Sequence, residues 1–199
     1  MTSSMAGRRL LLGIGSVVGC RALTTTARAA VAVTVVRVRA DSQREYLLVQ
    51  RAKPPRAGSW SIPGGKIEVG EPTLVAAARE LREETRLGPS DGIRFHPWAI
   101  ASSDVITRGA DGDVAFHFVI TQFLAFVRAD AQPVAGDDAL GVRWVTASAV
   151  DNGSLELGGN VGAIFRRAEA LLRSGSVTEA DALVVDDAGA DLPEFLVER

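Results

Sequence analysis

Residues 64–87, GGKIEVGEPTLVAAARELREETRL, constrain the fold of this chain more than any other stretch of its sequence. Alanine, leucine, glutamate and arginine are strong helix formers, so this composition predicts a helix. Pro72 suits the first helical position, where its missing N–H costs nothing. We expect the helix to run to about Arg86 and to stop at Gly88-Pro89.

Three glutamates of this helix predict a metal site. At about 100° per residue, Glu80, Glu83 and Glu84 lie within one face, next to the apolar stripe that contains Leu74 and Leu81. Like charges at this spacing destabilise a helix, unless a cation lies among them. Carboxylate oxygens, without histidine or cysteine, are the ligands that suit Mg²⁺ or Mn²⁺. The alternative interpretation is a solvated acidic face.

An arginine and three glycines predict how the preceding loop meets this helix. Arg79 precedes Glu83 by four residues and is placed to reach back to Glu71, which would tie the loop to the helix. Glycines allow tight turns and a close approach of the backbone to a ligand; they are Gly64, Gly65 and Gly70.

The whole stretch resembles the Nudix box, a pattern of glycine, five residues, glutamate, seven residues, Arg-Glu, an aliphatic residue, any residue and Glu-Glu, followed by glycine and an aliphatic residue. A chance match of this many positions is on the order of one in a hundred thousand. The positions in register are Gly65, Glu71, Arg79, Glu80, Leu81, Glu83, Glu84 and Leu87.

The resemblance implies roles for the residues in register. Glu83 and Glu84 would be the principal metal ligands, Glu80 a further ligand or the general base, and the Gly65 carbonyl would complete the coordination. Glu71 and Arg79 would be structural. The implied cofactor is Mg²⁺ or Mn²⁺, and the implied reaction is attack of a metal-activated water on phosphorus.

One position departs from the family pattern. Arg86 stands where the family has glycine, near a helix end where a left-handed residue is common. An arginine in that conformation would cost about 1 kcal/mol or more. We expect a modest structural cost, with Gly88 allowing the helix to run on slightly, and no loss of metal ligands.

The remaining patterns predict an α/β (α+β) fold with one domain, residues 29–175, to which the resemblance extends. The Nudix fold that it implies is a mixed β-sheet sandwiched between α-helices. Alternating or β-branched runs predict strands, and helical spacing predicts a second helix. The expected strands are 29–38, 45–51, 93–103, 114–127 and 142–145, and the second helix is 160–173.

Three residues outside the box are weighed as further site residues. Arg51 ends a strand that should point into the site, where it would bind substrate phosphate. Trp60 would stack on a base, although a tryptophan in a small domain is more often part of the core. His117, between two phenylalanines of a strand, is read as a satisfied, half-buried histidine rather than a catalyst.

Some Nudix enzymes add an acidic metal ligand from a later strand. The run 114–127 contains no acid, and Gln122 occupies the corresponding region. Asp137 or Asp138, in the loop AGDD, would substitute, or form an ordinary polar turn.

Charge and composition divide the ends of the chain from its body. Residues 1–40 carry six arginines and no acid, so the remaining residues have a net charge of −8, which argues against nucleic-acid binding. Residues 1–28 resemble a mitochondrial presequence, with a secretory signal or a cytoplasmic, uncleaved terminus as alternatives; their apolar run is too short for a membrane span. Residues 176–199 form an acidic tail that we expect to be loosely packed or partly disordered.

The function that we expect is hydrolysis of a phosphoanhydride bond in a nucleoside diphosphate linked to another moiety. Weak flanking similarity to the ADP-ribose pyrophosphatase-like branch favours ADP-ribose, although the proline that often marks this branch is replaced by Ser102 and Ser103. The alternatives are an ordinary or oxidised (d)NTP, or a non-catalytic nucleotide-binding module. The expected partner is a small nucleotide, with neither nucleic acid nor membrane, and the chain is expected to form a homodimer.

Overall fold

The computed structural model describes residues 26–54, 56–136, 138–185, 192–193 and 196. The targeting segment predicted at residues 1–28 lies almost wholly outside this part of the chain. Among the described residues, no helix combines the length and the apolar character that crossing a membrane requires.

The strands are β1 (Arg28–Val38), β2 (Arg44–Arg51), β3 (Trp60–Ser61), β4 (Gly64–Lys66), β5 (Arg94–Phe95), β6 (Ala101–Arg108), β7 (Val114–Phe126) and β8 (Ala139–Val145). The helices are α1 (Thr73–Thr85), α2 (Ala147–Asp151) and α3 (Val161–Arg173), with short 3₁₀ turns η1 (Pro89–Asp91) and η2 (Glu179–Asp181).

All eight strands belong to one mixed sheet. Its main path runs β3-β2-β1-β7-β5, with β4 paired to β1, β6 to β7 and β8 to β2. β1 and β7 are parallel, whereas the other pairs are antiparallel. β1 is central because its run of valines and alanines is buried over most of its length.

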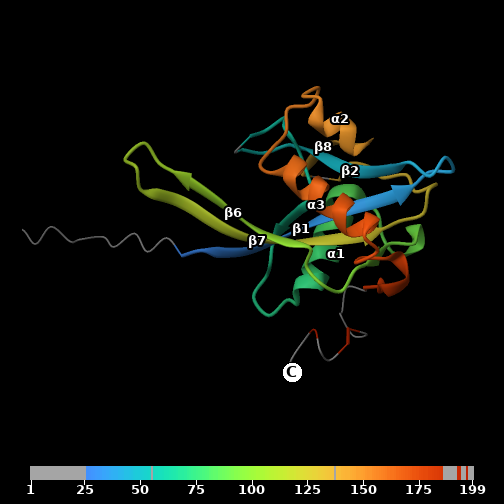
Figure 1. Cartoon of the computed structure of the whole chain (residues 1–199). Helices are drawn as coiled ribbons and strands as arrows, with labels where there is room; N and C mark the ends of the chain where they lie inside the picture. Colours follow the sequence, from blue (N-terminus) through green and yellow to red (C-terminus); the bar gives the residue numbers. More distant parts are fainter. Residues whose placement is uncertain (1–25, 55, 137, 186–191, 194–195, 197–199) are drawn as a thin grey trace, which may run out of the picture.

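Helices cover both faces of this sheet (Figure 1). The apolar stripe of α1, which includes Leu74 and Leu81, packs with Val33 and Phe123 in one core cluster. Ile164 and Phe165 of α3 pack against the opposite face, in a second cluster. The predicted mixed sheet between helices is therefore confirmed, and the two clusters place α1 and α3 on opposite sides of it.

Three predicted elements differ from the structure. The strand predicted at 93–103 is two strands, β5 and β6, because Pro97 has no N–H to give to a ladder and His96 Nδ1 instead lies 3.0 Å from the Trp98 carbonyl oxygen in a turn. α1 begins at Thr73, with Pro72 as an extended N-cap residue rather than the first helical residue. α2 was not predicted, and Thr146 caps it by accepting a hydrogen bond from the Ala149 N–H.

Two peripheral parts of the fold stand out. β6 and the first half of β7 form a hairpin that projects beyond the body of the domain (Figure 1). Residues 176–185 of the predicted acidic tail are packed rather than loose: Leu183 exchanges two backbone hydrogen bonds of 2.7 Å with Phe95, and Val177 and Val185 are buried. Backbone pairing with β5 thus adds an edge segment that local sequence did not predict.

Candidate active site

The site forms where α1 meets β4. The backbone N–H of Gly64 donates a 2.9 Å hydrogen bond to Oε2 of Glu84. A Cβ atom at Gly65 would overlap the carboxylate of Glu80, and one at Gly64, where φ is +157°, would overlap the backbone of Val31. Glycine at 64 therefore permits the close pairing of β4 with β1, and glycine at 65 leaves the space that the Glu80 carboxylate occupies.

Arg79 connects this helix to the loop before it. Its Nε and its second terminal nitrogen donate to the two oxygens of Glu71 at 2.7 and 2.9 Å, and it also donates to the Lys66 carbonyl at 3.0 Å. This bidentate pairing holds the pKa of Glu71 below its usual value and raises that of Arg79. The predicted arginine bridge between loop and helix is present.

The three box glutamates have different surroundings. Glu80 accepts a 2.9 Å hydrogen bond from Arg79, and Glu83 accepts one of 3.3 Å from the same guanidinium while remaining 57% exposed. Glu84 is turned toward Gly64. Among the described residues, no three acidic, histidine or cysteine side chains converge as a ready-made metal cage. The shared helix face is as predicted, but the carboxylates point to different hydrogen-bond donors.

Burial of Glu80 and Glu84 leaves the negative charge of these two carboxylates poorly compensated. Desolvation is the main cause that raises the pKa of Glu84 to about 7; Glu80 and Asp138 add to the rise, whereas the Gly64 N–H and Arg51 oppose it. Desolvation also raises the pKa of Glu80, against the effect of Arg79. Carboxylate oxygens buried without enough positive charge fit a divalent cation in both charge and ligand type.

The C-terminal end of α1 lies at Arg86 itself. Arg86 is left-handed, with φ of 59° and ψ of 6°, and its N–H donates to the Arg82 carbonyl at 2.8 Å. Gly88 is extended, with φ of −151°. The expectation that Gly88 lets the helix run on was therefore wrong, and arginine adopts the conformation for which the family pattern has glycine.

Gly136 is a site residue that sequence reasoning missed. Its N–H donates to the Glu84 carbonyl at 2.9 Å, and the Val134 N–H donates to Thr85 at the same distance. A Cβ at Gly136 would overlap the Glu83 backbone. The loop before β8 thus caps the last turn of the glutamate helix; glycine in the AGDD run was the available signal.

Two predicted residues lie near Glu84. Arg51 and Asp138 are both close enough to alter its pKa, in opposite directions. Asp138 also pairs with Lys53, whose Nζ lies 2.5 Å from Oδ1. Asp137, the other candidate from this loop, lies outside the described residues. Arg51 and Asp138 therefore lie close to a box glutamate, and Lys53 lies beside Asp138.

Three other predicted positions lie elsewhere. Trp60 is half-buried against the cluster beneath α3, so it takes the core role that was its alternative. His117 bonds to Asp104 at 2.8 Å within the projecting hairpin, which agrees with a satisfied histidine. Gln122 is buried and donates to the Ser103 hydroxyl at 3.1 Å. Among the described residues, the contacts of these three side chains are with the α3 cluster, Asp104 and Ser103 rather than with the box glutamates.

Comparison with known proteins places the chain in a family. The model of the NUDIX domain matches residues 28–162. The chain therefore belongs to the Nudix family, which generally uses divalent metal ions.

Individual relatives match shorter stretches. A putative 8-oxo-dGTP diphosphatase 2 of Mycobacterium tuberculosis is 50% identical over 46 residues, 23% of this chain and 33% of the relative. An ADP-ribose pyrophosphatase of Methanocaldococcus jannaschii is 30% identical over 99 residues, 50% of this chain and 53% of the relative. The chain thus spans between a third and about half of the length of these relatives.

A solved structure shares the fold. It is a bifunctional NMN adenylyltransferase/ADP ribose pyrophosphatase from Francisella tularensis, complexed with AMP and a manganese ion. It aligns with a TM-score of 0.53 and 26% identity, over 77% of this chain and 43% of the other.

Proposed function

We propose that this chain is a divalent-metal-dependent pyrophosphohydrolase that cleaves a phosphoanhydride bond in a nucleoside diphosphate linked to another moiety. The observation that carries the proposal is the α1–β4 junction, where Glu84 accepts a hydrogen bond from the Gly64 N–H and the Glu80 carboxylate occupies the space beside Gly65 that a side chain would fill. Carboxylates gathered on one helix face and partly buried destabilise a fold unless they bind a cation, so their presence favours a functional role over a purely structural one.

The donor set supports a bound Mg²⁺ or Mn²⁺. Glu83 and Glu84 would hold the ion, with Glu80 and the Gly65 carbonyl as further oxygen donors, all of the hard type that these cations prefer. Once bound, the ion would lower the pKa of a water molecule and neutralise charge on the phosphates. The ion would also supply the positive charge that the buried carboxylates lack.

The remaining residues would position the reactants. Glu80 lies beside Arg79 and would either ligate the ion or accept a proton from the attacking water. Arg51, near Glu84, would contact a substrate phosphate. Glu71 and Arg79 would hold the loop in place without touching substrate.

ADP-ribose is the first candidate substrate. Its support is the Methanocaldococcus relative, which matches half of this chain, and the ADP ribose pyrophosphatase among the solved structures. An oxidised nucleotide such as 8-oxo-dGTP is the second candidate, supported by the higher identity of the shorter Mycobacterium match.

A substrate panel tests this function. Release of phosphate, through a coupled phosphatase, would be measured for ADP-ribose, other nucleoside-diphosphate sugars, dinucleoside polyphosphates, dGTP and 8-oxo-dGTP, with Mg²⁺, with Mn²⁺ and with EDTA. We expect metal-dependent turnover of ADP-ribose that EDTA abolishes. Preferential turnover of 8-oxo-dGTP would establish the second candidate, and turnover that is unaffected by EDTA would refute the metal-dependent mechanism.

A non-catalytic binding module is the rival from another class. Calorimetric titration of Mn²⁺ and nucleotide into wild type, Glu83→Gln and Glu84→Gln distinguishes the two. An enzyme of the proposed kind loses metal affinity in both variants. Nucleotide binding that survives both substitutions, with no turnover of the panel by wild type, would favour the module.

Oligomeric state and location are also proposals. We propose a homodimer, to be tested by light scattering of the purified chain, with a monomer as the contradicting result.

We propose a mitochondrial location on the composition of residues 1–28. Imaging of the full chain fused at its C-terminus to a fluorescent protein would test this, with cytoplasmic or secretory signal as the contrary result.

A further inference from the structure

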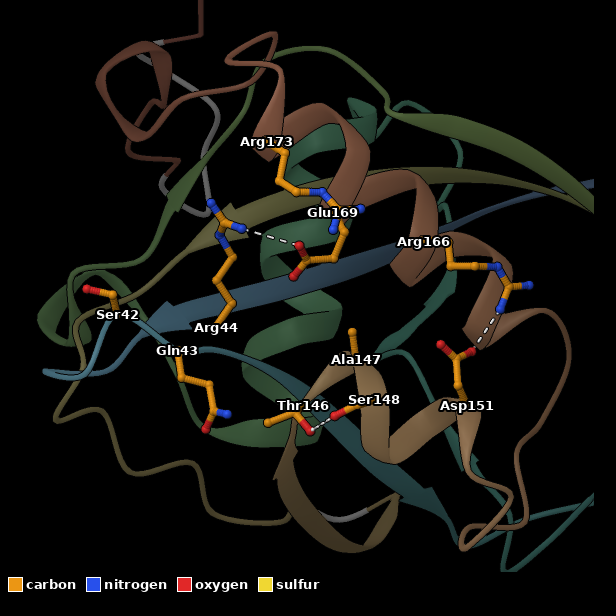
Figure 2. A pocket seen from close by; sticks show the side chains of 10 residues that line it. All are labelled: Ser42, Gln43, Arg44, Thr146, Ala147, Ser148, Asp151, Arg166, Glu169 and Arg173. Carbon is orange, nitrogen blue, oxygen red and sulfur yellow. Dashed lines mark hydrogen bonds and ion pairs between the residues drawn. The ribbon is translucent and has the colours of Figure 1, made fainter.

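A polar pocket lies on the α3 side of the sheet, across from the glutamate helix. It has a volume of about 390 Å³ and lies between the β1–β2 turn, α2 and α3 (Figure 2). α1 packs in the cluster on the other face of the sheet, so the pocket is separate from the α1–β4 junction. Nothing in the proposed hydrolysis uses it.

The side chains around this pocket are mostly hydrogen-bond donors. Arg44, Arg166 and Arg173 outnumber the two carboxylates of Asp151 and Glu169, although the chain beyond residue 40 is strongly acidic. Hydroxyl and amide groups complete the lining, from Ser42, Gln43, Thr146 and Ser148.

Glu169 is already paired with one cation, Arg44, and also accepts a hydrogen bond from a neutral hydroxyl. Its Oε2 accepts a 3.2 Å hydrogen bond from Arg44, and its Oε1 accepts one from the buried Tyr46 hydroxyl. Burial is the main cause that raises the pKa of Tyr46, with Glu169 adding to it, whereas Arg44 and Arg173 act in the opposite direction. Arg173 is thus a second guanidinium close to a carboxylate that is already paired.

At the Arg166–Asp151 end of the pocket, one positive charge is paired with one negative charge, so the excess positive charge lies at the other end. Arg166, in the middle of α3, donates to Asp151, the last residue of α2, at 2.8 Å (Figure 2). Arg173 forms no hydrogen bond or ion pair with the part of the chain that the structure describes. The unbalanced charge therefore lies at the Arg44–Arg173 end.

We propose that this pocket binds a small phosphorylated metabolite, with its phosphate group at the Arg44–Arg173 end. A phosphate monoester carries close to two negative charges and three strong acceptor oxygens. Those oxygens match guanidinium forks and hydroxyl donors, whereas a carboxylate would bring only one charge. A volume of about 390 Å³ lies within the range of small-molecule sites and leaves room for a sugar or nucleoside.

Amide chemical shifts of the ¹⁵N-labelled chain test this proposal directly. AMP, inorganic phosphate and, as a control without phosphate, adenosine would be titrated in EDTA, so that metal-dependent binding at α1 does not contribute. We expect AMP to shift residues 42–44 and 146–148, and adenosine to leave them unchanged. Shifts confined to residues 64–87, or no shift at saturating AMP, would overturn the proposal.

Matched arginine variants make the test specific. Arg173→Gln should weaken AMP binding about tenfold, the effect of losing one charged hydrogen bond. Arg167→Gln is the control, because Arg167 lies on the same helix but donates to the Ile100 carbonyl outside the pocket. Arg44→Gln is a second variant that removes the other guanidinium, with the same expected weakening.

AMP binding at this pocket can be tested separately from the proposed hydrolysis at α1. Glu84→Gln should leave AMP binding at this pocket unchanged, even if it abolishes hydrolysis. Equal AMP affinity in wild type, Arg173→Gln and Arg44→Gln would contradict the assignment of the phosphate position, and the spectra themselves show whether each variant is folded.

Discussion

At the scale of single residues, Arg86 holds a backbone conformation that side chains disfavour. It is left-handed at the end of α1, where a side chain costs about 1–2 kcal/mol relative to glycine. We predict that Arg86→Gly raises the free energy of unfolding by about 1 kcal/mol in urea denaturation. Arg82→Gly, inside the helix, should lower it by about the same amount. Destabilisation by Arg86→Gly would show that the arginine side chain supplies a contact of greater value.

Gly65 gives the sharpest test of the junction between strand and helix. We predict that Gly65→Ala lowers kcat at least tenfold, because its methyl group would displace the Glu80 carboxylate, and misplacement of a reacting group by about 1 Å can cost a hundredfold in rate. Gly88→Ala is the matched control, since its Cβ would meet no atom within 4 Å. Steady-state kinetics with equal rates in both variants would contradict the role assigned to this contact.

The ion pair of Glu71 with Arg79 makes the stability of the fold depend on pH. Its folded pKa lies below the ordinary value of 4.5 because of its hydrogen bonds with Arg79. Its pairing therefore stabilises the fold fully above the unfolded pKa, and this stabilisation is lost as the pH falls through the lower folded pKa. We predict that Glu71→Gln costs about 1–2 kcal/mol of unfolding free energy at pH 7, and that the difference from wild type shrinks steadily below pH 4.5. A difference that is constant from pH 7 to pH 3 would show that the carboxylate charge is not the cause.

At the scale of elements, the described tail belongs to the core rather than to solvent. Val185 is 5% exposed and packs in the α1 cluster, whereas its neighbour Val184 is 58% exposed. We predict that Val185→Ser lowers the free energy of unfolding by about 2 kcal/mol, and that Val184→Ser changes it by less than about 0.5 kcal/mol. Similar effects of the two variants in chemical denaturation would indicate that this segment is not packed in solution.

Elements defined by their own residues could be predicted from sequence, and elements defined by distant partners could not. β1, β7 and α3 match their expected ranges within a residue or two, because their apolar patterns identify both type and length. β6 runs to Arg108 because β7 pairs with it along that length. Leu183 joins the sheet through Phe95, 88 positions earlier, and no local pattern indicates such a pairing.

At the scale of the whole molecule, the same distinction applies to the candidate site. The Arg79–Glu71 bridge followed from spacing, because both residues belong to one short stretch. The packing of Trp60 against the cluster beneath α3 did not follow from spacing, because its side of the sheet depends on pairing with Gln50. The glycine in the AGDD run marks Gly136 as a turn residue, but its contact with α1 and the lining of the polar pocket both depend on loops from distant parts of the chain, so spacing does not predict their positions.

The central claim is that the glutamates of α1 support metal-dependent cleavage of a phosphoanhydride bond. The most direct test is kcat/KM for the best substrate of the panel, at saturating Mg²⁺, in wild type, Glu84→Gln and Glu179→Gln. Glu179 is exposed in η2 and is the matched control for loss of one carboxylate. The account predicts a loss of about a hundredfold or more in Glu84→Gln and an unchanged value in Glu179→Gln. Turnover in a folded Glu84→Gln variant that equals wild type would contradict it.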